Sequence, residues 1–167
     1  MDKNPIKSNL LQTLRQRGYK VTPQRNAIID IISEDRSHPG AHDIFRKARR
    51  KLSAISISTV YSTLDLFKRE GLVKELEFYD MENRYEADIS DHINLVCMKC
   101  GAVQDLHSRI PIDGREVEYM TGFRPLRMRF EYYGWCRECR RSLILGLRIR
   151  MPSVSTVIPG AGTKRRM

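Results

Sequence analysis

The cysteine arrangement constrains this chain more than any other feature of its sequence. All four cysteines lie in two CxxC pairs, Cys97 with Cys100 and Cys136 with Cys139. Thiolate sulfur is a strong zinc ligand, and a CxxC turn can bring two sulfurs to within about 2.3 Å of one ion, so two such turns complete a tetrahedron. A tetrahedron of sulfurs leaves no open position, and we therefore expect a structural zinc ion.

Other chemistries of paired cysteines fit this sequence less well. Disulfides are disfavoured because the N-terminal residues MDKNPIKSNL lack the apolar core of a secretory signal, and we expect a cytoplasmic protein. A redox dithiol needs one CxxC pair after a strand in a thioredoxin-like context, which is missing here. A zinc deaminase needs an H-x-E partner and a proline before a CxxC pair, and the sequence has neither.

The zinc ion would tie together two strands that are distant in sequence. One strand begins at His92 and the other ends at Trp135, each next to one CxxC pair. Structural zinc contributes folding free energy on the order of 10 kcal/mol in small domains. We therefore expect the loss of any one of the four cysteines to unfold this half of the chain.

The basic charge of the chain is concentrated at its C-terminus. Residues 140–167 carry seven basic side chains and no acidic one, and removing them from the formal net charge of +10 leaves +3. The net charge of the whole chain is therefore weak evidence for a nucleic-acid partner. Local runs of basic residues are the better evidence. No stretch approaches about 18 uninterrupted apolar residues, so we expect a soluble protein with no membrane partner.

Two helices are predicted near the N-terminus. Ser8 can cap the first helix, which carries a leucine stripe and stops before Gly18. Thr22 followed by Pro23 is the usual pairing of an N-cap residue with a proline in the first helical turn. Isoleucines at helical spacing follow this pair and indicate a buried face.

Two further helices and a hairpin complete a recognisable motif. Residues 41–52 form an apolar stripe opposite a densely basic side, and a fourth helix, capped by Ser58, ends before Gly71. Residues 72–78 and 84–88 then read as two strands around a turn. Helices followed by such a hairpin indicate a winged helix-turn-helix domain over residues 1–86.

The second half of the chain predicts a small, zinc-stabilised domain over residues 87–142. Strands are expected at 92–97 and 102–106, and a short helix at 114–122. The stretch 125–133 alternates apolar and polar residues, which predicts a strand with one buried face. The fold class is therefore α+β, and residues 143–167 are expected to form a disordered basic tail.

In a helix-turn-helix domain the second helix of the motif enters the major groove, which identifies candidate DNA contacts. The outward side of the fourth helix offers Ser58, Thr59, Tyr61 and Ser62, with Tyr61 suited to a thymine methyl group. Candidate phosphate contacts are Lys20, Gln24 and Arg25 at the second helix, and Arg49 and Arg50 within the basic run 46–51. The alternative for this run is a solvated helix face.

Several motifs, in order, resemble the ferric uptake regulator family of metal-responsive repressors. They are GYKVTPQRNAII, SHPGAHDIF, ISTVYSTLDLFKREGLVKE, NRYE, DHINLVCMKCG and EYYGWCREC. The resemblance implies a homodimer that binds double-stranded DNA. It also implies an N-terminal winged-helix domain, a small C-terminal α/β dimerisation domain, and zinc in the two CxxC pairs.

The resemblance also implies a second, regulatory metal site for Fe²⁺ or Mn²⁺, with a second Zn²⁺ as a further option. His38, Glu86, His92 and Asp105 fall on its ligand positions. Asn94 departs from the family pattern of two histidines before the first CxxC pair, and an amide oxygen binds transition metals more weakly than imidazole. Because two of the four ligands belong to each half of the chain, one ion would fix the angle between the halves.

Three functions compete at this point. The first is a dimeric, metal-dependent repressor of iron or metal homeostasis genes, and the second is a winged-helix DNA-binding module with structural zinc only. The third is a peroxide- or thiol-responsive regulator. Peroxide-sensing relatives usually carry Asp at the position of Glu86 and both strand histidines, so metal response is favoured. An enzyme is not expected, since no nucleophile-base pair and no open metal position emerge.

Overall fold

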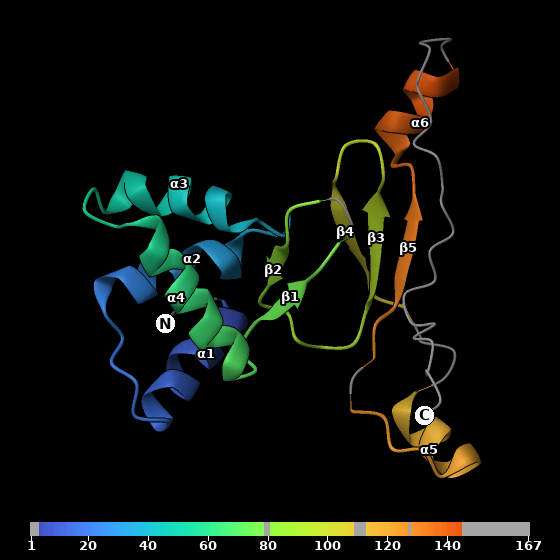
Figure 1. Ribbon diagram of the computed structural model, residues 1–167, viewed down its shortest axis with the longest axis horizontal. Helices are drawn as coiled ribbons and strands as arrows, with labels where there is room; N and C mark the ends of the chain where they lie inside the picture. Colours follow the sequence, from blue (N-terminus) through green and yellow to red (C-terminus); the bar gives the residue numbers. More distant parts are fainter. Residues whose placement is uncertain (1–3, 79–80, 109–112, 127, 145–167) are drawn as a thin grey trace, which may run out of the picture.

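Two unequal halves make up the molecule in the computed structural model, which describes residues 4–78, 81–108, 113–126 and 128–144. The winged-helix half contains four helices and a short hairpin, and the sheet half contains three strands with a helix beyond each end (Figure 1). This arrangement agrees with the predicted α+β class. Within the described residues no helix is long and apolar enough to cross a membrane.

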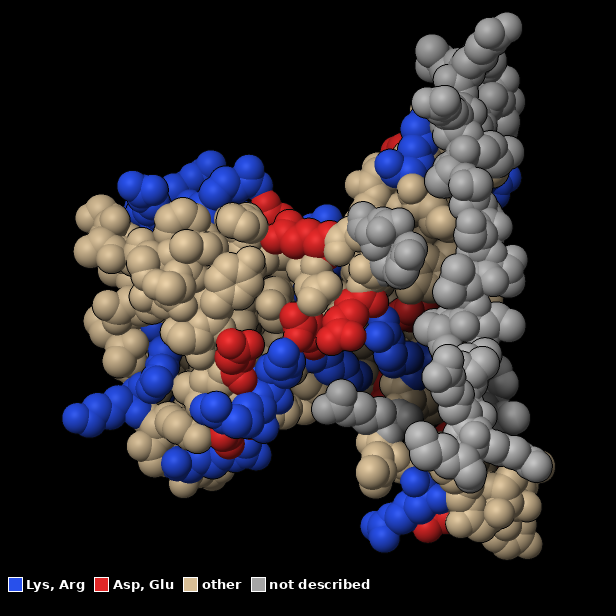
Figure 2. Space-filling view, viewed as in Figure 1, with Lys and Arg blue, Asp and Glu red and all other residues tan. Residues whose placement is uncertain are grey.

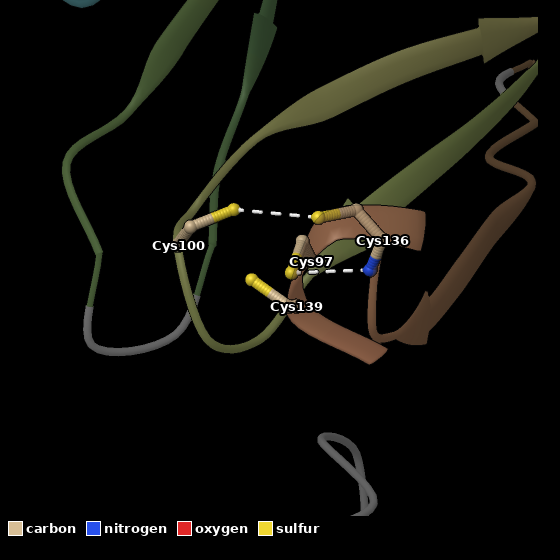
Figure 3. Close-up of side chains that lie close together, drawn as sticks. All are labelled: Cys97, Cys100, Cys136 and Cys139. Atoms are coloured by element: carbon tan, nitrogen blue, oxygen red, sulfur yellow. Dashed lines mark hydrogen bonds between the residues drawn. The ribbon is translucent and has the colours of Figure 1, made fainter. Parts of the chain in front are cut away.

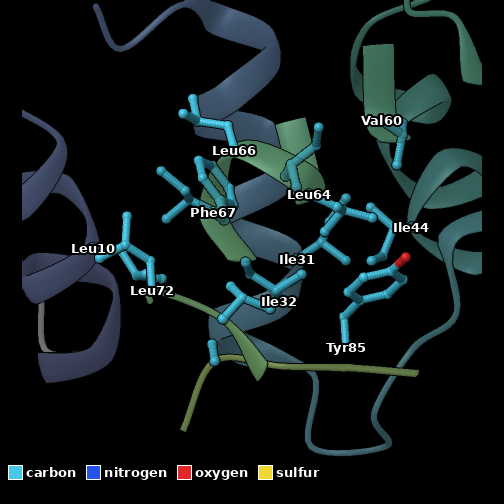
Figure 4. Close-up of a cluster of buried hydrophobic side chains, with 14 of the residues drawn as sticks. Leu10, Ile31, Ile32, Ile44, Val60, Leu64, Leu66, Phe67, Leu72 and Tyr85 are labelled. Carbon is cyan, nitrogen blue, oxygen red and sulfur yellow. The ribbon is translucent and has the colours of Figure 1, made fainter. Parts of the chain in front are cut away.

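The winged-helix half is built on a single apolar core. Its helices are α1 (Pro5–Gln16), α2 (Pro23–Glu34), α3 (Ala41–Lys51) and α4 (Ile57–Arg69). Ile44, Leu64 and Phe67 are completely buried where these helices meet, and Tyr85 of the hairpin closes the cluster (Figure 4). The apolar stripes predicted for the four helices all contribute to this core.

The helix starts show which capping predictions hold. Thr22 caps α2 as predicted, since its side chain accepts a hydrogen bond from the Arg25 N–H. The caps predicted at Ser8 and Ser58 are wrong, because the helices begin earlier: Asn4 caps α1 and Ser56 caps α4. In both cases a second good N-cap residue lies just upstream and takes the role.

The wing is a two-stranded antiparallel hairpin. It consists of β1 (Lys74–Leu76) and β2 (Arg84–Glu86), with Glu75 opposite Tyr85. An isolated bridge between Gly40 and Arg84 attaches the loop before α3 to the outer edge of β2. Gly71 provides the positive φ of 64° that turns the chain from α4 into the wing.

The sheet half contains a three-stranded sheet of order β4-β3-β5. The central strand β3 (Ile93–Cys97) is antiparallel to β4 (Val103–Leu106) and parallel to β5 (Glu131–Gly134). Leu76 and Phe78 from the wing pack against Val96 and Val103 of this sheet. This small second core joins the two halves.

Two helices flank the sheet, and one of them was not predicted. Helix α5 (Gly114–Thr121) lies where expected, with a capping box between Asp113 and Glu116 and a left-handed Gly122 at its end. Helix α6 (Arg137–Ile144) was not predicted and runs past the expected domain boundary at residue 142. The tail predicted for 143–167 otherwise lies outside the described residues.

The predicted strand at 125–133 is mostly wrong. Only residues from Glu131 onward form β5, and none of the apolar positions is fully buried: Leu126 is 90% and Tyr132 65% exposed, while Met128 and Phe130 are half-buried. Nearby, Tyr119 and Phe123 are 93% and 67% exposed. Within the described residues nothing covers this surface, so its apolar pattern does not reflect packing inside one subunit.

The core position of Phe67 leads to a stability prediction. Phe67→Ala should lower the free energy of unfolding by about 3–5 kcal/mol, because it leaves a cavity in a close-packed core. Tyr61→Ala on the outward side of the same helix should change it by less than about 0.5 kcal/mol. Urea denaturation of the zinc-loaded proteins, followed by circular dichroism, measures both, and equal effects would contradict the assigned core.

Candidate metal centres

The four cysteines converge at one end of the sheet and form a sulfur cluster. Cys97 ends β3, Cys100 closes the turn after it, Cys136 follows β5, and Cys139 lies in α6 (Figure 3). All four sulfurs lie within 4.8 Å of one another. The cluster joins the ends of β3 and β5, which are neighbouring parallel strands. This agrees with the prediction that one ion ties together two strands that are distant in sequence.

The spacing of the sulfurs fits a zinc ion and not disulfides. All four cysteines are free thiols, and the Sγ atoms of Cys100 and Cys136 are 3.8 Å apart. A disulfide requires about 2.05 Å. Four sulfurs at about 2.3 Å from a central zinc ion would lie about 3.8 Å apart along each edge of the tetrahedron. The site therefore fits zinc with no further adjustment at this edge.

The thiols of the sulfur cluster differ in their pKa values. Burial opposes ionisation of Cys97, but backbone N–H groups, first among them that of Cys136 at 3.3 Å, lower its pKa below the ordinary value. Burial and the neighbouring sulfurs raise the pKa of Cys139 to about 12. A bound metal ion deprotonates such thiols outright, which would bring all four sulfurs to the thiolate form.

A second group of ligand-type side chains, the seam cluster, lies between the two halves. His38 follows α2 and Glu86 ends β2, whereas His92 precedes β3 and Asp105 belongs to β4. Their ligand atoms lie within 4.8 Å of one another. The structure thus brings together all four residues that the sequence placed on the second metal site.

The contacts in the seam cluster are short but do not form hydrogen bonds. His92 Nε2 lies 2.6 Å from Glu86 Oε1, and His38 Nε2 lies 2.8 Å from Asp105 Oδ1. Neither pair has the geometry of a hydrogen bond, because Glu86 Oε1, Asp105 Oδ1 and His92 Nε2 have no hydrogen-bond partner. Nitrogen and oxygen atoms that face one another in this way are arranged as metal ligands are.

Unpaired buried atoms are concentrated at this cluster. Among the described residues, seven buried side-chain nitrogen or oxygen atoms have no hydrogen-bond partner: one each on His38, His92, Asn94, Asp105 and Asp30, and two on Glu86. Asp30 faces the Lys7 ammonium group at 3.2 Å, which accounts for its oxygen. Native structures rarely leave such groups unsatisfied. The residues present therefore fit a bound divalent cation.

His38 has an unusual backbone conformation. Its φ of 53° is the one positive value outside glycine among the described residues, and the next residue is Pro39. The left-handed region is uncommon for residues other than glycine, and a following proline favours extended backbone instead. A hydrogen bond from the Tyr85 N–H to the Pro39 carbonyl, 3.1 Å long, holds the loop in place. Such strain is concentrated at functional sites.

The surroundings of the seam cluster set the protonation of its histidines. His92 Nδ1 lies 3.0 Å from the Ser90 carbonyl, so it carries the proton and leaves Nε2 free to face the cluster. Asp88 holds this turn by accepting hydrogen bonds from the N–H and hydroxyl of Ser90. Burial opposes a charge on His38, but Glu86 and Asp105 outweigh it and raise its pKa.

The predicted DNA contacts lie on α4, on α3 and at the start of α2 in the winged-helix half. Ser58, Tyr61 and Ser62 are exposed on the outer side of α4, while Thr59 is half-buried, with its hydroxyl 2.8 Å from that of Ser56. Lysine and arginine side chains line the outer edge of α3 (Figure 2). The surface is therefore a polar helix beside a basic one.

Some of the basic residues form ion pairs within the protein, and others remain free to contact phosphate. On α3, Arg46 pairs with Asp43 and Lys47 with Asp35, whereas within the described part of the chain Arg49 and Arg50 have no acidic partner. At α2, Lys20 and Gln24 are exposed, but Arg25 is half-buried and donates to the Lys20 carbonyl at 2.7 Å. Arg49 and Arg50 are therefore better placed for phosphate contacts than Arg25.

Comparison with known proteins gives consistent matches. The sequence model of the Ferric uptake regulator family matches residues 16–133. The chain is 38% identical over 135 residues to the peroxide operon regulator of Bacillus subtilis (strain 168), covering 78% of this chain and 91% of that protein. A solved zinc-bound manganese uptake regulator is 32% identical with a TM-score of 0.59, covering 76% of this chain and 98% of that one.

A third match supports the fold alone. The ferric uptake regulator of Helicobacter pylori superposes with a TM-score of 0.65 at 24% identity, covering 81% of this chain and 91% of that chain.

The sulfur cluster leads to a prediction about zinc. Cys139→Ser should lose the zinc ion and unfold the sheet half, because one ligand of a closed tetrahedron is removed, while the separate core of the winged-helix half stays folded. Lys99→Ser, a change at an exposed position in the Cys97–Cys100 turn, is the control and should retain one zinc per subunit. Metal analysis and hydrogen exchange measure both effects, and a zinc-loaded, fully protected Cys139→Ser protein would exclude this site.

Proposed function

The chain belongs to the ferric uptake regulator family, and on this premise we propose that its homodimer represses transcription when a divalent cation occupies the seam cluster. It is a metal-dependent DNA-binding transcriptional regulator with a zinc ion in its sulfur cluster. The cation would act by fixing the angle between the winged-helix half and the sheet half.

One observation carries this proposal: each half contributes one histidine and one carboxylate to the seam cluster, and their ligand atoms lie within 4.8 Å. Without a cation, the carboxylates of Glu86 and Asp105 leave buried oxygens unpaired. A bound Fe²⁺ or Mn²⁺ would supply the missing positive charge, and a second Zn²⁺ is a further option. The two halves are then held at one angle by their own side chains.

The exposed apolar side chains of α5 and the segment that follows it support a homodimer. Tyr119, Phe123 and Leu126 project from α5 and the segment after it, and β5 is an edge strand of the described sheet. Large exposed apolar patches mark interaction sites, and a second copy of the chain would cover this one. Two winged-helix halves could then reach two half-sites about one helical turn of DNA apart, roughly 34–36 Å.

We propose a regulatory and not a catalytic role, in the cytoplasm. Four sulfurs complete the coordination of a zinc ion and leave no position for a substrate. The seam cluster is buried between the halves, so a cation there is suited to joining them.

A second candidate function is a response to peroxide. The relatives in Bacillus subtilis and Staphylococcus epidermidis are named as a peroxide operon regulator and a peroxide-responsive repressor, at 38% and 34% identity. This chain has Glu86 where peroxide-sensing relatives usually have Asp, and Asn94 where they have a histidine. Both departures favour a metal response.

Metal control can be tested by DNA binding at fixed salt concentration. An operator can be selected from random duplexes with the Mn²⁺-loaded protein, and its affinity measured with and without Mn²⁺ or Fe²⁺. We expect the metal to strengthen binding by about 5- to 150-fold, the usual size of allosteric coupling. His38→Ala should keep its structural zinc and lose this response.

The same assay separates the candidate functions. An unchanged affinity in the presence of either metal would exclude metal control and leave a DNA-binding module with structural zinc only. If hydrogen peroxide weakens DNA binding by the Fe²⁺-loaded protein, and fresh Fe²⁺ does not restore it, the peroxide response would replace the metal response as the proposed function.

The DNA face gives a second prediction for the same operator. Tyr61→Ala should weaken binding by about 1–3 kcal/mol and reduce discrimination between sequences, since a base-edge contact is lost. Arg50→Ala should weaken binding equally on all sequences and lower the salt dependence by about one counterion. Negligible effects of both substitutions would place the interface elsewhere.

A further inference from the structure

Asn94 lies on the same face of the sheet as the seam cluster. It is two residues after His92, and side chains alternate along a strand, so both point to one side. It is also directly opposite Asp105 in the β3–β4 ladder. Directly opposite residues have Cβ atoms about 4.5–5.5 Å apart. Asn94 is therefore an immediate neighbour of two seam ligands.

The amide oxygen of Asn94 is buried without a partner. The residue is 7% exposed, and its Oδ1 atom accepts no hydrogen bond. A buried polar atom in this state costs about 1–3 kcal/mol. The strand partners of Asn94 on its two sides, Asp105 and Glu131, are both carboxylates and offer no donor when ionised. Only a positive charge or a donor from outside these side chains can satisfy the oxygen.

The space beside this amide is small. Asn94 and His92 line a cavity of about 40 Å³ together with the cationic side chains of Lys74 and Arg129, neither of which donates to the amide oxygen. This volume gives the side chain room to adjust and is close to the volume of one water molecule. The Glu131 carboxylate across the ladder is already held by Arg129 at 3.0 Å and by the Tyr133 hydroxyl at 2.5 Å.

We propose that the Asn94 amide oxygen is a fifth ligand of the cation in the seam cluster and shifts its selectivity away from Zn²⁺ toward Mn²⁺. This inference rests on the proposed function, since it requires a cation at the seam. The ligand set then contains two imidazole nitrogens and three oxygens, of which the amide is neutral. Oxygen ligands suit Mn²⁺, whereas imidazole suits Zn²⁺, and a fifth protein ligand disfavours tetrahedral zinc.

The neutral charge of the amide also has a consequence. Two carboxylates already balance the charge of a divalent cation, so an amide adds a ligand without adding charge. A histidine in its place would also be neutral, so Asn94→His changes the donor atom from oxygen to nitrogen and leaves the charge unchanged. This substitution therefore isolates the effect of donor type on metal preference.

The test measures metal binding to the full-length protein with its structural zinc in place. Dissociation constants for Mn²⁺ and Zn²⁺ at the second site are obtained by competition with a fluorescent chelator. Asn94→Ala should weaken Mn²⁺ binding about tenfold or more and Zn²⁺ binding less, and Asn94→His should strengthen Zn²⁺ relative to Mn²⁺ about tenfold or more. Asn94→Asp, which keeps the oxygen, should bind Mn²⁺ at least as tightly as the natural chain.

Controls separate ligation from a structural role. Gln104→Ala removes an exposed amide from the other face of β4 and should leave both constants unchanged. Thermal unfolding of each variant without the second metal reports folding by itself. A structural role would weaken both metals equally and lower the melting temperature of Asn94→Ala, and this outcome would overturn the proposal.

Two further outcomes are decisive. Natural affinities for both metals in Asn94→Ala would show that the amide is not a ligand, while the proposed function would stand. If the natural chain binds no second metal, and His38→Ala binds equally little, the proposed function itself fails, together with the inference that rests on it.

Discussion

Two buried carboxylates at the junction of two small bodies are the constraint on which the rest of this structure depends. Glu86 and Asp105 lie close together at the seam, and each has buried oxygen that accepts no hydrogen bond. Removing a carboxylate from water costs several kcal/mol unless opposite charge and hydrogen bonds compensate. The apolar contact between the halves is small, consisting of Leu76 and Phe78 against two valines. Electrostatic interactions at the seam therefore contribute strongly to the relative orientation of the two halves.

The central strand of the sheet links the two ion sites. His92 lies just before β3 and Cys97 is its last residue, so five residues, or about 17 Å of extended chain, connect the seam to the sulfur cluster. The sulfur cluster joins the ends of β3 and β5 and so fixes this strand. A site made wholly of thiolate is closed and suited to stability, whereas a mixed nitrogen and oxygen site can exchange its ion. The sulfur cluster is therefore suited to stabilising the fold, and the seam cluster to responding to the metal concentration.

Local chemistry could be predicted from the sequence more reliably than assembly. The cysteine pairs, the Thr22 cap and the turn at Gly71 were predictable because each depends on neighbouring residues. The first residues of α1 and α4 were predicted wrongly because Asn4 and Ser56, which are equally good N-cap residues, lie upstream of the predicted caps. The strand predicted at 125–133 was mostly wrong. Alternation of apolar and polar residues indicates that one face is to be buried, but it does not say whether the same subunit or a second one buries it. The four residues of the seam cluster were predicted from the family resemblance. That the Asn94 amide oxygen has no hydrogen-bond partner could be learned only from the three-dimensional structure.

The loop between α2 and α3 gives the strained backbone at His38 a mechanical meaning. Only Pro39 separates this seam residue from Gly40, which is the N-cap of the basic helix α3. Proline fixes its own φ near −65°, so this short link has few ways to absorb movement. A cation that shifts the His38 backbone would therefore also shift the start of α3, which carries Arg49 and Arg50. The seam cluster and the candidate phosphate contacts on α3 are thus linked along the backbone through a single residue.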